Sequence, residues 1–490
     1  GQLRVSLDRC DLDLAQVAGL REMIGDQFSG LGPARGWTAS QHIMAVVLLN
    51  LAGGDCVDDL DVLDGDHGFG EILRQAEVYR LGRRQRRILQ RRWRKERDRT
   101  VPSPSALRRF LHLFHRVDQE ELRQDGHAFI PAPNEMLRRL QGLHPRLISF
   151  FHSRLGGGDR ATLDMDATLV ETHKESARYC YKKFKAYQPL NTWWAELGMI
   201  VHTEFRDGNV PAGWQQLRVF QEALANLPAS IEKVYLRSDS AGYQWDLLRY
   251  CAEGQDRRFG VIEFAVSCDV TPDFKRAVAE VAEEDWRPLW RTVDGHRQPT
   301  NQQWAEVYFV PSGAGFKKHG PGYRYLAIRE VLPQLELPRM EAPELPFPVM
   351  SMASDRYKLT GVVTNRTIAA EELIWWSRER CGEREQAHAV MKDDLAGGRL
   401  PSGQFEANAA WWQMMILALN LNAALQRLAL GESWVKKRMK TMRFSLINIP
   451  ARVIHHGNRL WIQVADLGQR LETLLAARRR ILALATGPPG

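Results

Sequence analysis

Paired cysteines and long hydrophobic runs are both missing from the 490-residue chain. Its six cysteines lie far apart and form no CxxC pair, which argues against a disulfide framework and against a zinc module. No apolar run approaches the roughly 18–20 residues that cross a bilayer, and the first residues have no signal-peptide pattern. We therefore expect a cytoplasmic protein that makes no contact with membranes.

Negative charge is also in short supply, with 59 acidic against 67 basic side chains and a formal net charge of +8. This excess favours a polyanionic partner, although many proteins are mildly basic. The hydrophobic content of 44% can support folded cores throughout, and the length predicts two to four domains.

The basic side chains are concentrated between Arg83 and Arg99, where ten arginines and lysines stand against Glu96 and Asp98. A solvated helix face is the common explanation of such a run. Here the cations would repel one another without a counterion, so we favour contact with phosphate groups. With two outward-facing arginines of the following helix included, the predicted DNA-binding residues are Arg83, Arg84, Arg86, Arg87, Arg91, Arg92, Arg94, Lys95, Arg108 and Arg109.

Residues 1–155 have a mostly helical pattern. Ser40–Leu51 predicts an apolar helix that ends at Gly53. Beyond the basic run, Ser103 or Ser105 can cap a helix that presents its apolar residues inward. Two short helices across a Pro/Ser turn fit a helix-turn-helix arrangement, so we expect this region to bind DNA.

Two acids share one face of a predicted strand. Apolar and polar residues alternate through Ala161–Val170, and the polar face carries Asp164, Asp166 and Thr168. Asp is a poor strand former, so the pair needs a reason. It is either the solvated face of an edge strand or an oxygen-rich site for a hard cation such as Mg²⁺. This segment alone does not decide between them.

Mixed α/β character continues to about residue 268, where strand and helix patterns alternate. The predicted elements after the first strand are a strand at Leu190–Phe205, a turn at Asp207–Asn209, a strand at Val210–Trp214, a helix at Gln215–Ala225, and strands at Lys233–Asp239 and Phe259–Cys268. Strand-strand-strand-helix-strand-helix-strand is the order of the RNase H-like fold. Asp239 ends its strand, which is where α/β sheets build their sites.

The predicted fold is therefore an α/β RNase H-like catalytic core, a mixed five-stranded sheet with helices, interrupted by a mostly β insertion and preceded by an α-helical DNA-binding region. Its second part contains a long helix at Ile368–Leu395 and a strongly apolar helix at Ala407–Leu425. The predicted division is a DNA-binding region at 1–155, a first core part at 156–268, a β-rich subdomain at 269–350, a second core part at 351–425 and a basic C-terminal region at 426–490.

Three motifs follow one another along this predicted core. D-x-T begins at Asp166, R-x-D-S runs from Arg237 through Asp239, and E-x6-K joins Glu385 to Lys392. In this order they resemble the DDE transposases of bacterial insertion sequences, members of the RNase H-like, retroviral-integrase superfamily. The resemblance extends over about residues 161–425.

The helix motif departs from the pattern of that family. Its tyrosine and arginine have no clean match, because Trp376 and Arg378 or Arg380 stand nearby at altered spacing. The sequence leaves open which arginine serves the motif.

The resemblance implies that Asp166, Asp239 and Glu385 are catalytic and hold two Mg²⁺ ions, for which Mn²⁺ could substitute. Two ions about 4 Å apart can activate the attacking oxygen and stabilise the leaving oxygen in a displacement at phosphorus. Asp164 would support Asp166, and Lys392 would hold a DNA phosphate. Without the two aspartate motifs, Glu385 and Lys392 would be an ordinary pair on a helix surface.

The implied function is a cut-and-paste DNA transposase. It would bind the terminal inverted repeats of its element, cleave the double-stranded DNA ends and join them to target DNA, as a homodimer in a synaptic complex associated with the bacterial nucleoid. The alternatives are an RNase H-fold nuclease without strand transfer and a domesticated DNA-binding protein.

Trp286, Trp290 and Trp304 of the predicted insertion allow two interpretations. In related enzymes with a β insertion, an aromatic side chain there stacks on a flipped base. Alternatively, each tryptophan packs in the core of the subdomain. His388 is expected to pack or to contact the DNA backbone, because no other histidine is placed to help it hold a metal.

Overall fold

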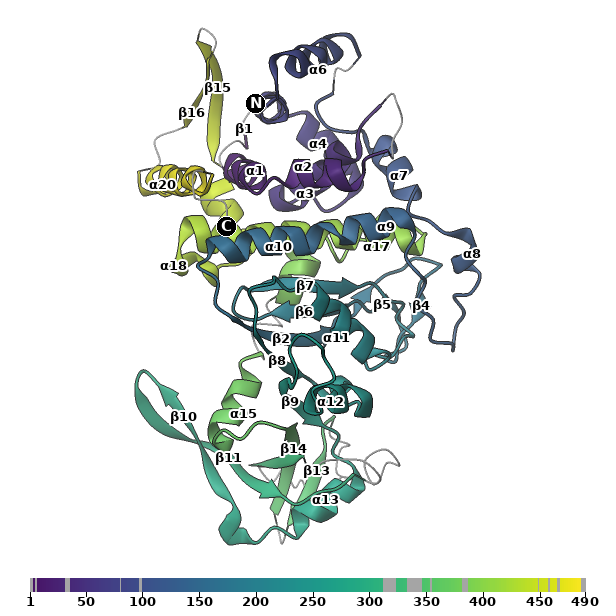
Figure 1. Cartoon of the computed structure of the whole chain (residues 1–490), viewed down its shortest axis with the longest axis vertical. Helices are drawn as coiled ribbons and strands as arrows, with labels where there is room; N and C mark the ends of the chain where they lie inside the picture. Colours follow the sequence, from purple (N-terminus) through teal and green to yellow (C-terminus); the bar gives the residue numbers. More distant parts are fainter. Residues whose placement is uncertain are drawn as a thin grey trace, which may run out of the picture.

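A mixed sheet of ten strands dominates the described part of the chain in the computed structural model (Figure 1). Its strands are β2 (Arg160–Ala167), β6 (Leu190–Trp194), β7 (Met199–Glu204), β8 (Lys233–Ser238), β9 (Glu263–Cys268), β10 (Arg287–Val293), β11 (His296–Val307), β12 (Arg324–Val331), β13 (Val349–Met352) and β14 (Asp355–Thr364). They are ordered β10-β11-β12-β14-β9-β8-β2-β6-β7, and β13 pairs with β14 beside this path.

The structure describes residues 3–4, 7–30, 36–79, 81–96, 99–311, 323–332, 346–352, 355–380, 387–447, 449–456, 459–464 and 468–485. Within these ranges, no helix combines the length and the apolar character needed to cross a membrane.

The part of the sheet that carries the predicted acids has β2 at its centre. β2 pairs in parallel with β8 on one side and antiparallel with β6 on the other, and β8 continues in parallel to β9. Helix α11 (Gln216–Ala225) connects β7 to β8, and α12 (Trp245–Ala252) connects β8 to β9. These five strands and two helices follow the predicted succession along the chain.

The predicted second and third strands are wrong in detail. Leu190–Phe205 is a hairpin of β6 and β7 rather than one strand, because the chain turns at Ala195–Gly198, where Gly198 adopts a φ of 63°. Val210–Trp214, predicted to be the third strand, contains no strand. Three short strands also intervene between β2 and β6 and form a small sheet of their own: β3 (Val170–Glu171), β4 (Arg178–Tyr179) and β5 (Lys185–Tyr187).

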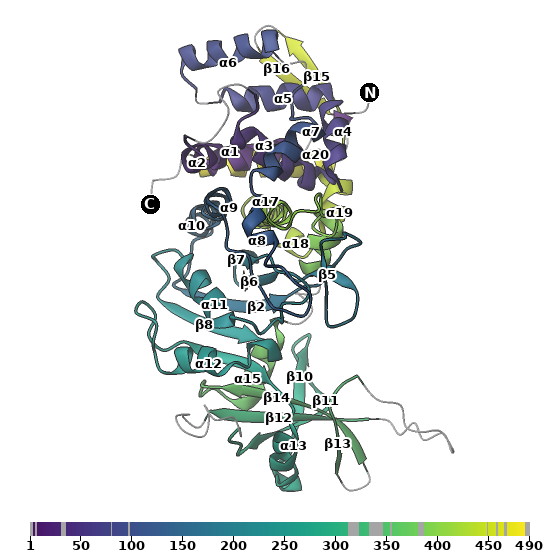
Figure 2. The same cartoon turned by 90° about the vertical axis from the view of Figure 1, so that its right-hand side faces the viewer.

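The predicted insertion does not form a separate sheet. β14 pairs antiparallel with β9, and β12, β11 and β10 follow outward, so the core and the insertion share one continuous ladder. The five-stranded sheet expected from the sequence is therefore half of a larger one. Helix α13 (Pro272–Ala279) lies at the far end of this part of the molecule (Figures 1 and 2).

Helix α17 (Phe405–Ala424) forms the centre of the molecule, and all its 20 residues are buried, as its apolar sequence predicted. It lies between the sheet and the N-terminal helices in both views (Figures 1 and 2). Its Asn420 side chain accepts a hydrogen bond from the Ile200 amide at 2.9 Å and donates one to the Ile200 carbonyl at 2.9 Å. The helix thereby satisfies backbone groups of β7, the last strand of the sheet, which would otherwise be unpaired.

The N-terminal region is helical, as predicted. Its helices are α1 (Leu7–Val17), α2 (Leu20–Gln27), α3 (Ala39–Ala52), α4 (Leu60–Asp64), α5 (His67–Glu77), α6 (Arg83–Glu96), α7 (Pro104–His112), α8 (Val117–Glu120), α9 (Glu135–Gln141) and α10 (Leu143–Arg154). Ser103 caps α7, which packs against α3 and α17.

The C-terminal part packs on this helical region. It contains a hairpin of β15 (Pro450–His456) and β16 (Arg459–Val464), and β15 also pairs with the short β1 (Leu3–Arg4). Helix α20 (Gln469–Leu484) packs against α1. Both ends of the described chain therefore belong to one end of the molecule.

Candidate active site

Asp166 and Asp239 are brought together by two parallel strands. Asp166 is the penultimate residue of β2, and Asp239 directly follows β8. The register pairs Met165 with Ser238, which places the two acids at the same step of adjacent strands. Parallel strands end at the same edge of a sheet, so a separation of 73 residues along the chain becomes a close approach in space.

The electrostatics of Asp166 reflect this approach. Its pKa is raised from 3.8 to about 6. Burial is the largest cause and the negative charge of Asp239 the second, while the positive charge of Arg380 lowers the pKa. The Asp239 side chain accepts a hydrogen bond from the Ala241 amide at 3.0 Å, which orients it at the start of a short helical turn, Ser240–Gly242. The site therefore holds two acids that repel each other in a largely buried position.

Asp164 lies on the same face of β2 but has a different partner. The register places Arg237 beside it, and the guanidinium donates to both carboxylate oxygens, at 2.6 and 3.0 Å. Both side chains are buried. Asp164 is thus paired with a cation, Arg237, whereas Asp166, two residues later on the same face, lies beside another anion, Asp239.

Arg237 also connects β8 to helix α15 (Ala370–Arg378). Its Nη1 donates to the Trp376 carbonyl at 2.7 Å and to Glu379 Oε2 at 2.8 Å. Sequence reasoning used Arg237 only as part of a motif and missed this role. The sequence did contain a signal for it. When the D-x-D of β2 is aligned with the R-x-D of its parallel neighbour β8, Asp164 falls beside Arg237 and Asp166 beside Asp239.

Glu385 lies outside the described residues, as does the whole of 381–386. The structure does describe both flanks of this segment, which belong to the predicted helix at Ile368–Leu395: α15 on one side and a helical stretch from Ala387, ending in a π-helix at Val390–Asp394, on the other. Both flanks approach Asp166. The charge of Arg380 acts on its carboxylate, and His388 Nε2 lies 3.9 Å from its Oδ2.

The two candidate arginines of the helix motif differ in their surroundings. Arg378 lies over the ring of Trp375, with its guanidinium carbon 5.3 Å from the ring centre. Arg380 is the one whose charge reaches Asp166. Lys392 is half-buried in the π-helix.

The predicted DNA-binding residues fall into groups with different surroundings. In α6 the side chains of Arg83, Arg84, Arg86, Arg87 and Arg91 are exposed. The side chains of Arg92, Arg94 and Lys95 lie outside the described residues.

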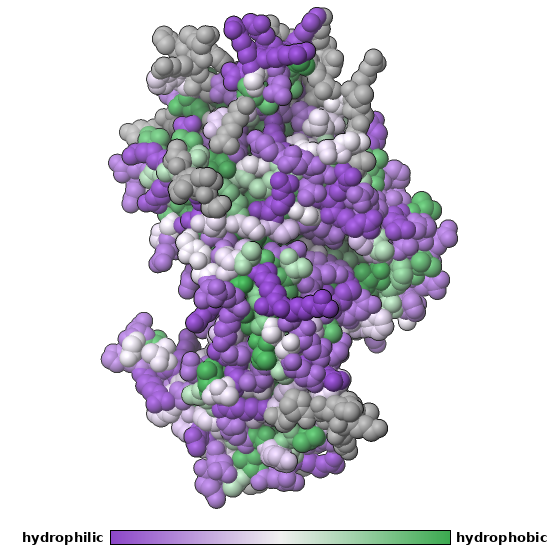
Figure 3. Space-filling view, viewed as in Figure 1, coloured by the Kyte–Doolittle hydropathy of each residue, from purple (hydrophilic) through white to green (hydrophobic). Residues whose placement is uncertain are grey.

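Helix α6 lies at the end of the molecule, on the far side of α10 and α17 from the sheet (Figures 1 and 2), where the surface is strongly hydrophilic (Figure 3). In α7, Arg109 is exposed, whereas Arg108 donates to both oxygens of Asp58 at 2.8 Å. Arg108 therefore already has an anionic partner within the chain.

The three tryptophans proposed to stack on bases are divided by the structure. Trp286 and Trp304 are buried, with exposed fractions of 6% and 8%, as expected for the alternative in which each tryptophan packs in a core. Trp304 lies on β11 and Trp286 directly precedes β10, so strands of the main sheet place both side chains. Trp290 is half-buried, and its ring lies 5.3 Å from the guanidinium carbon of Arg297. Only Trp290 keeps part of its ring accessible.

The acid pair fits a divalent cation. The negative charge of Asp239 helps to raise the pKa of Asp166, and a cation between the two carboxylates would relieve this repulsion; Mg²⁺ and Mn²⁺ prefer such oxygen ligands. Asp166 and Asp239 are the described residues that would hold the ion, and the described residues Arg380 and His388, on either side of 381–386 in the sequence, both act on Asp166.

The sheet topology and the paired acids fit a DDE transposase, and a family model shows that class directly. A family model described as "Transposase DDE domain group 1" matches residues 37–308 and 350–486, which is well over half of the chain. The chain belongs to this family. A comparison with curated proteins found no match.

A solved structure is similar over most of the chain. It is the cryo-EM structure of the piggyBac transposase synaptic complex with hairpin DNA, which matches with 10% sequence identity and a TM-score of 0.42, over 89% of this chain and 78% of that one.

Proposed function

We propose that this DDE transposase binds the terminal inverted repeats of a bacterial insertion sequence, cleaves its DNA ends and joins them to target DNA by a cut-and-paste route. The observation that carries the proposal is the meeting of Asp166 and Asp239 at the ends of two parallel strands. We further propose that β7-β6-β2-β8-β9, with α11 and α12, is an RNase H-like core whose third acid is Glu385.

The residues of the site would divide the work of a displacement at phosphorus. Asp166 and Asp239, with Glu385, would hold two Mg²⁺ or Mn²⁺ ions, which stabilise the charge that develops on the attacking and leaving oxygens. Arg237 would position the site, because it fixes the end of α15 to the strand beside Asp166. Arg380, and His388 when protonated, would place positive charge beside the scissile phosphate.

Helix α6 would supply affinity for DNA that does not depend on base sequence. Its exposed arginines match a phosphate backbone in charge, and each phosphate contact releases counterions. Two element ends must be held together for transposition, so we propose a homodimer as the working form. Light scattering of the protein with and without end DNA tests that state.

The central experiment uses Asp166→Ala, Asp239→Ala and Glu385→Ala, with Glu280→Ala on the exposed end of α13 as the matched control. We expect the three site variants to keep binding to element ends while strand cleavage with Mg²⁺ or Mn²⁺ falls by several orders of magnitude, and the control to cleave normally. Cleavage that survives all three changes would refute the assignment.

The same assay separates transposition from simple hydrolysis. A cut 3′ end that becomes joined to a target plasmid demonstrates strand transfer. Cleavage without joined products, under conditions in which the ends are synapsed, identifies a nuclease of the same fold.

A further inference from the structure

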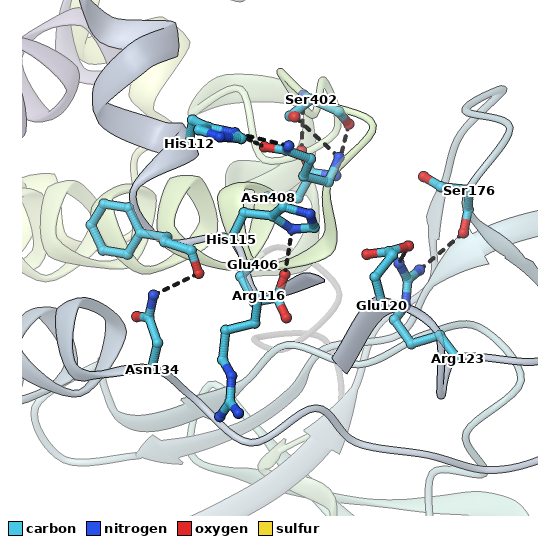
Figure 4. A network of polar contacts seen from close by, with 12 residues as sticks. His112, His115, Arg116, Glu120, Arg123, Asn134, Ser176, Ser402, Glu406 and Asn408 are labelled. Carbon is cyan, nitrogen blue, oxygen red and sulfur yellow. Dashed lines mark hydrogen bonds and ion pairs between the residues drawn. The ribbon is translucent and has the colours of Figure 1, made fainter. Parts of the chain in front are cut away.

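A second cluster of potential metal ligands lies away from the acid pair, where the N-terminal helices meet α17. It consists of His115, Glu120 and Glu406, each of which offers one ligand atom, and these atoms all lie within 4.8 Å of one another. His115 follows α7, Glu120 ends α8, and Glu406 is in the first turn of α17. Figure 4 shows the three side chains together with the arginines that surround them.

The cluster contains buried oxygens that the protein does not satisfy. Glu406 is 1% exposed; its Oε2 lies 3.1 Å from His115 Nδ1, and its Oε1 is buried without a hydrogen-bond partner among the described residues. Glu120 pairs with Arg123 through Oε1, while its Oε2 is likewise buried and unpartnered in the described part of the chain. A carboxylate oxygen buried in this way costs free energy unless a cation or a donor reaches it.

The charge around the cluster is negative. Arg123 donates to both oxygens of Asp207 at 2.7 Å, and Arg116 pairs with Asp118. Arg123 also pairs with Glu120, so these two guanidinium groups face the four carboxylates of Asp118, Asp207, Glu120 and Glu406, and two negative charges remain. One divalent cation balances that charge.

The ligand atoms also suit a particular kind of cation. The 3.1 Å between His115 Nδ1 and Glu406 Oε2 is close to the roughly 3.3 Å that separates two ligands of one tetrahedral zinc ion, from bond lengths of about 2.0–2.1 Å. One imidazole nitrogen with two carboxylate oxygens favours first-row transition metals over Mg²⁺, and Zn²⁺ over Mn²⁺. Arg123 holds Glu120 through Oε1, so Oε2 is the oxygen that would turn toward the ion and close the remaining gap.

We propose that His115, Glu120 and Glu406 bind one Zn²⁺ ion, or a first-row divalent ion of the same class, separate from the ions of the acid pair. The ion would join the loop between α7 and α8 to the first turn of α17. It would thus fasten the helical region that carries α6 to the buried helix at the centre of the molecule.

The test measures Zn²⁺ binding in a protein whose acid site is disabled. The full chain with Asp166→Asn, Asp239→Asn and Glu385→Gln is the parent, so the result does not depend on the proposed catalytic function. Isothermal titration with Zn²⁺ in excess Mg²⁺ is expected to give one site per chain. Co²⁺ in the same protein should give the visible absorption of a site with a nitrogen ligand.

Variants then assign the site. Added to the parent, Glu120→Gln and Glu406→Gln should each weaken Zn²⁺ binding at least 100-fold, and Glu121→Gln, the exposed neighbour, should leave it unchanged. Zn²⁺ should raise the thermal unfolding midpoint of the parent by several degrees but not that of Glu120→Gln, whose folding is checked by circular dichroism. Absence of Zn²⁺ binding in the folded parent, or binding that both glutamine variants retain, would overturn the proposal and leave His115 and Glu406 as a plain ion pair.

Discussion

Asp164 and Asp166 stand two residues apart on one strand face, and the structure predicts opposite effects when each is made neutral. The pKa of Asp166 is raised to about 6 in the folded protein from an ordinary 3.8, because its carboxylate is buried and next to Asp239. A difference of about two pKa units corresponds to about 3 kcal/mol, since one unit is worth about 1.4 kcal/mol. Because the side chain is 21% exposed, solvent screening lowers the expected effect to about 2–3 kcal/mol.

The sign follows from proton binding. Between pH 3.8 and about 6 the folded state holds a proton on Asp166 that the unfolded state has lost, so stability falls as pH rises through this window. Above about pH 6 the carboxylate is charged in both states, and the folded state keeps the full free-energy cost of holding that charge buried. Asp166→Asn removes the charge, so in a chelator at pH 7 the variant should be more stable than the original protein by about 2–3 kcal/mol, and equal to it below the window.

Asp164→Asn is the matched comparison. Asp164 neutralises buried Arg237, and removing one partner of a buried ion pair typically costs about 3–5 kcal/mol. The two variants should therefore move the urea unfolding midpoint in opposite directions at pH 7 with EDTA present. Mg²⁺ should then stabilise the original protein and Asp164→Asn, but have much less effect on Asp166→Asn.

One result would refute this reasoning. If Asp166→Asn is no more stable than the original protein at pH 7 in EDTA, or if its gain is the same at pH 3.5, the burial of the Asp166 carboxylate beside Asp239, which raises its pKa, does not exist in solution. The Asp166 carboxylate would then not lie in the buried, negatively charged position that the strand register gives it.

Three further predictions follow from the same structure. The first concerns four exposed arginines of α6: Arg83, Arg84, Arg86 and Arg87. Replacing all four by alanine should weaken binding to any DNA sequence and make the slope of log affinity against log salt concentration shallower by about 3–4. The control, Lys275→Ala with Arg276→Ala at the opposite end of the molecule, should change neither the affinity nor the slope. Asn420→Leu should lower the free energy of unfolding by about 2–4 kcal/mol, because it leaves the amide and carbonyl of Ile200 buried without partners. Arg380→Gln removes a charge that lowers the pKa of Asp166, so the acid limb of the pH–cleavage profile should move to higher pH, and Arg378→Gln should leave that limb in place.

The sequence carried enough information to find the two aspartates. Asp166 lies in an alternating strand pattern, and Asp239 ends a second one, so local periodicity together with the rules of parallel sheets predicts their meeting. The same reasoning could not distinguish Asp164 from Asp166. Their difference depends on Arg237, whose position beside Asp164 is set by a register between strands 73 residues apart.

Long-range pairing explains most of what the sequence did not predict. The insertion was expected to be a separate subdomain because nothing local indicates that β14 pairs with β9, nearly a hundred residues earlier. The hairpin of β6 and β7 was missed because its turn, Ala195–Gly198, contains one glycine and no proline within an otherwise continuous β-branched and aromatic run. The burial of Trp286 and Trp304 follows from the same shared sheet.

The continuous ladder from β7 to β10 has a mechanical consequence. Two domains joined by a linker can rotate relative to each other. Neighbouring strands of one sheet resist such motion, because it would break the backbone hydrogen bonds between them. The β10–β11 hairpin is thus a rigid extension of the sheet, and its direction is fixed by the strands that carry Asp166 and Asp239. Bending it would strain β9 and β8 before it moved freely, so a DNA end that reaches both the hairpin and the acids must adapt its own shape to this frame.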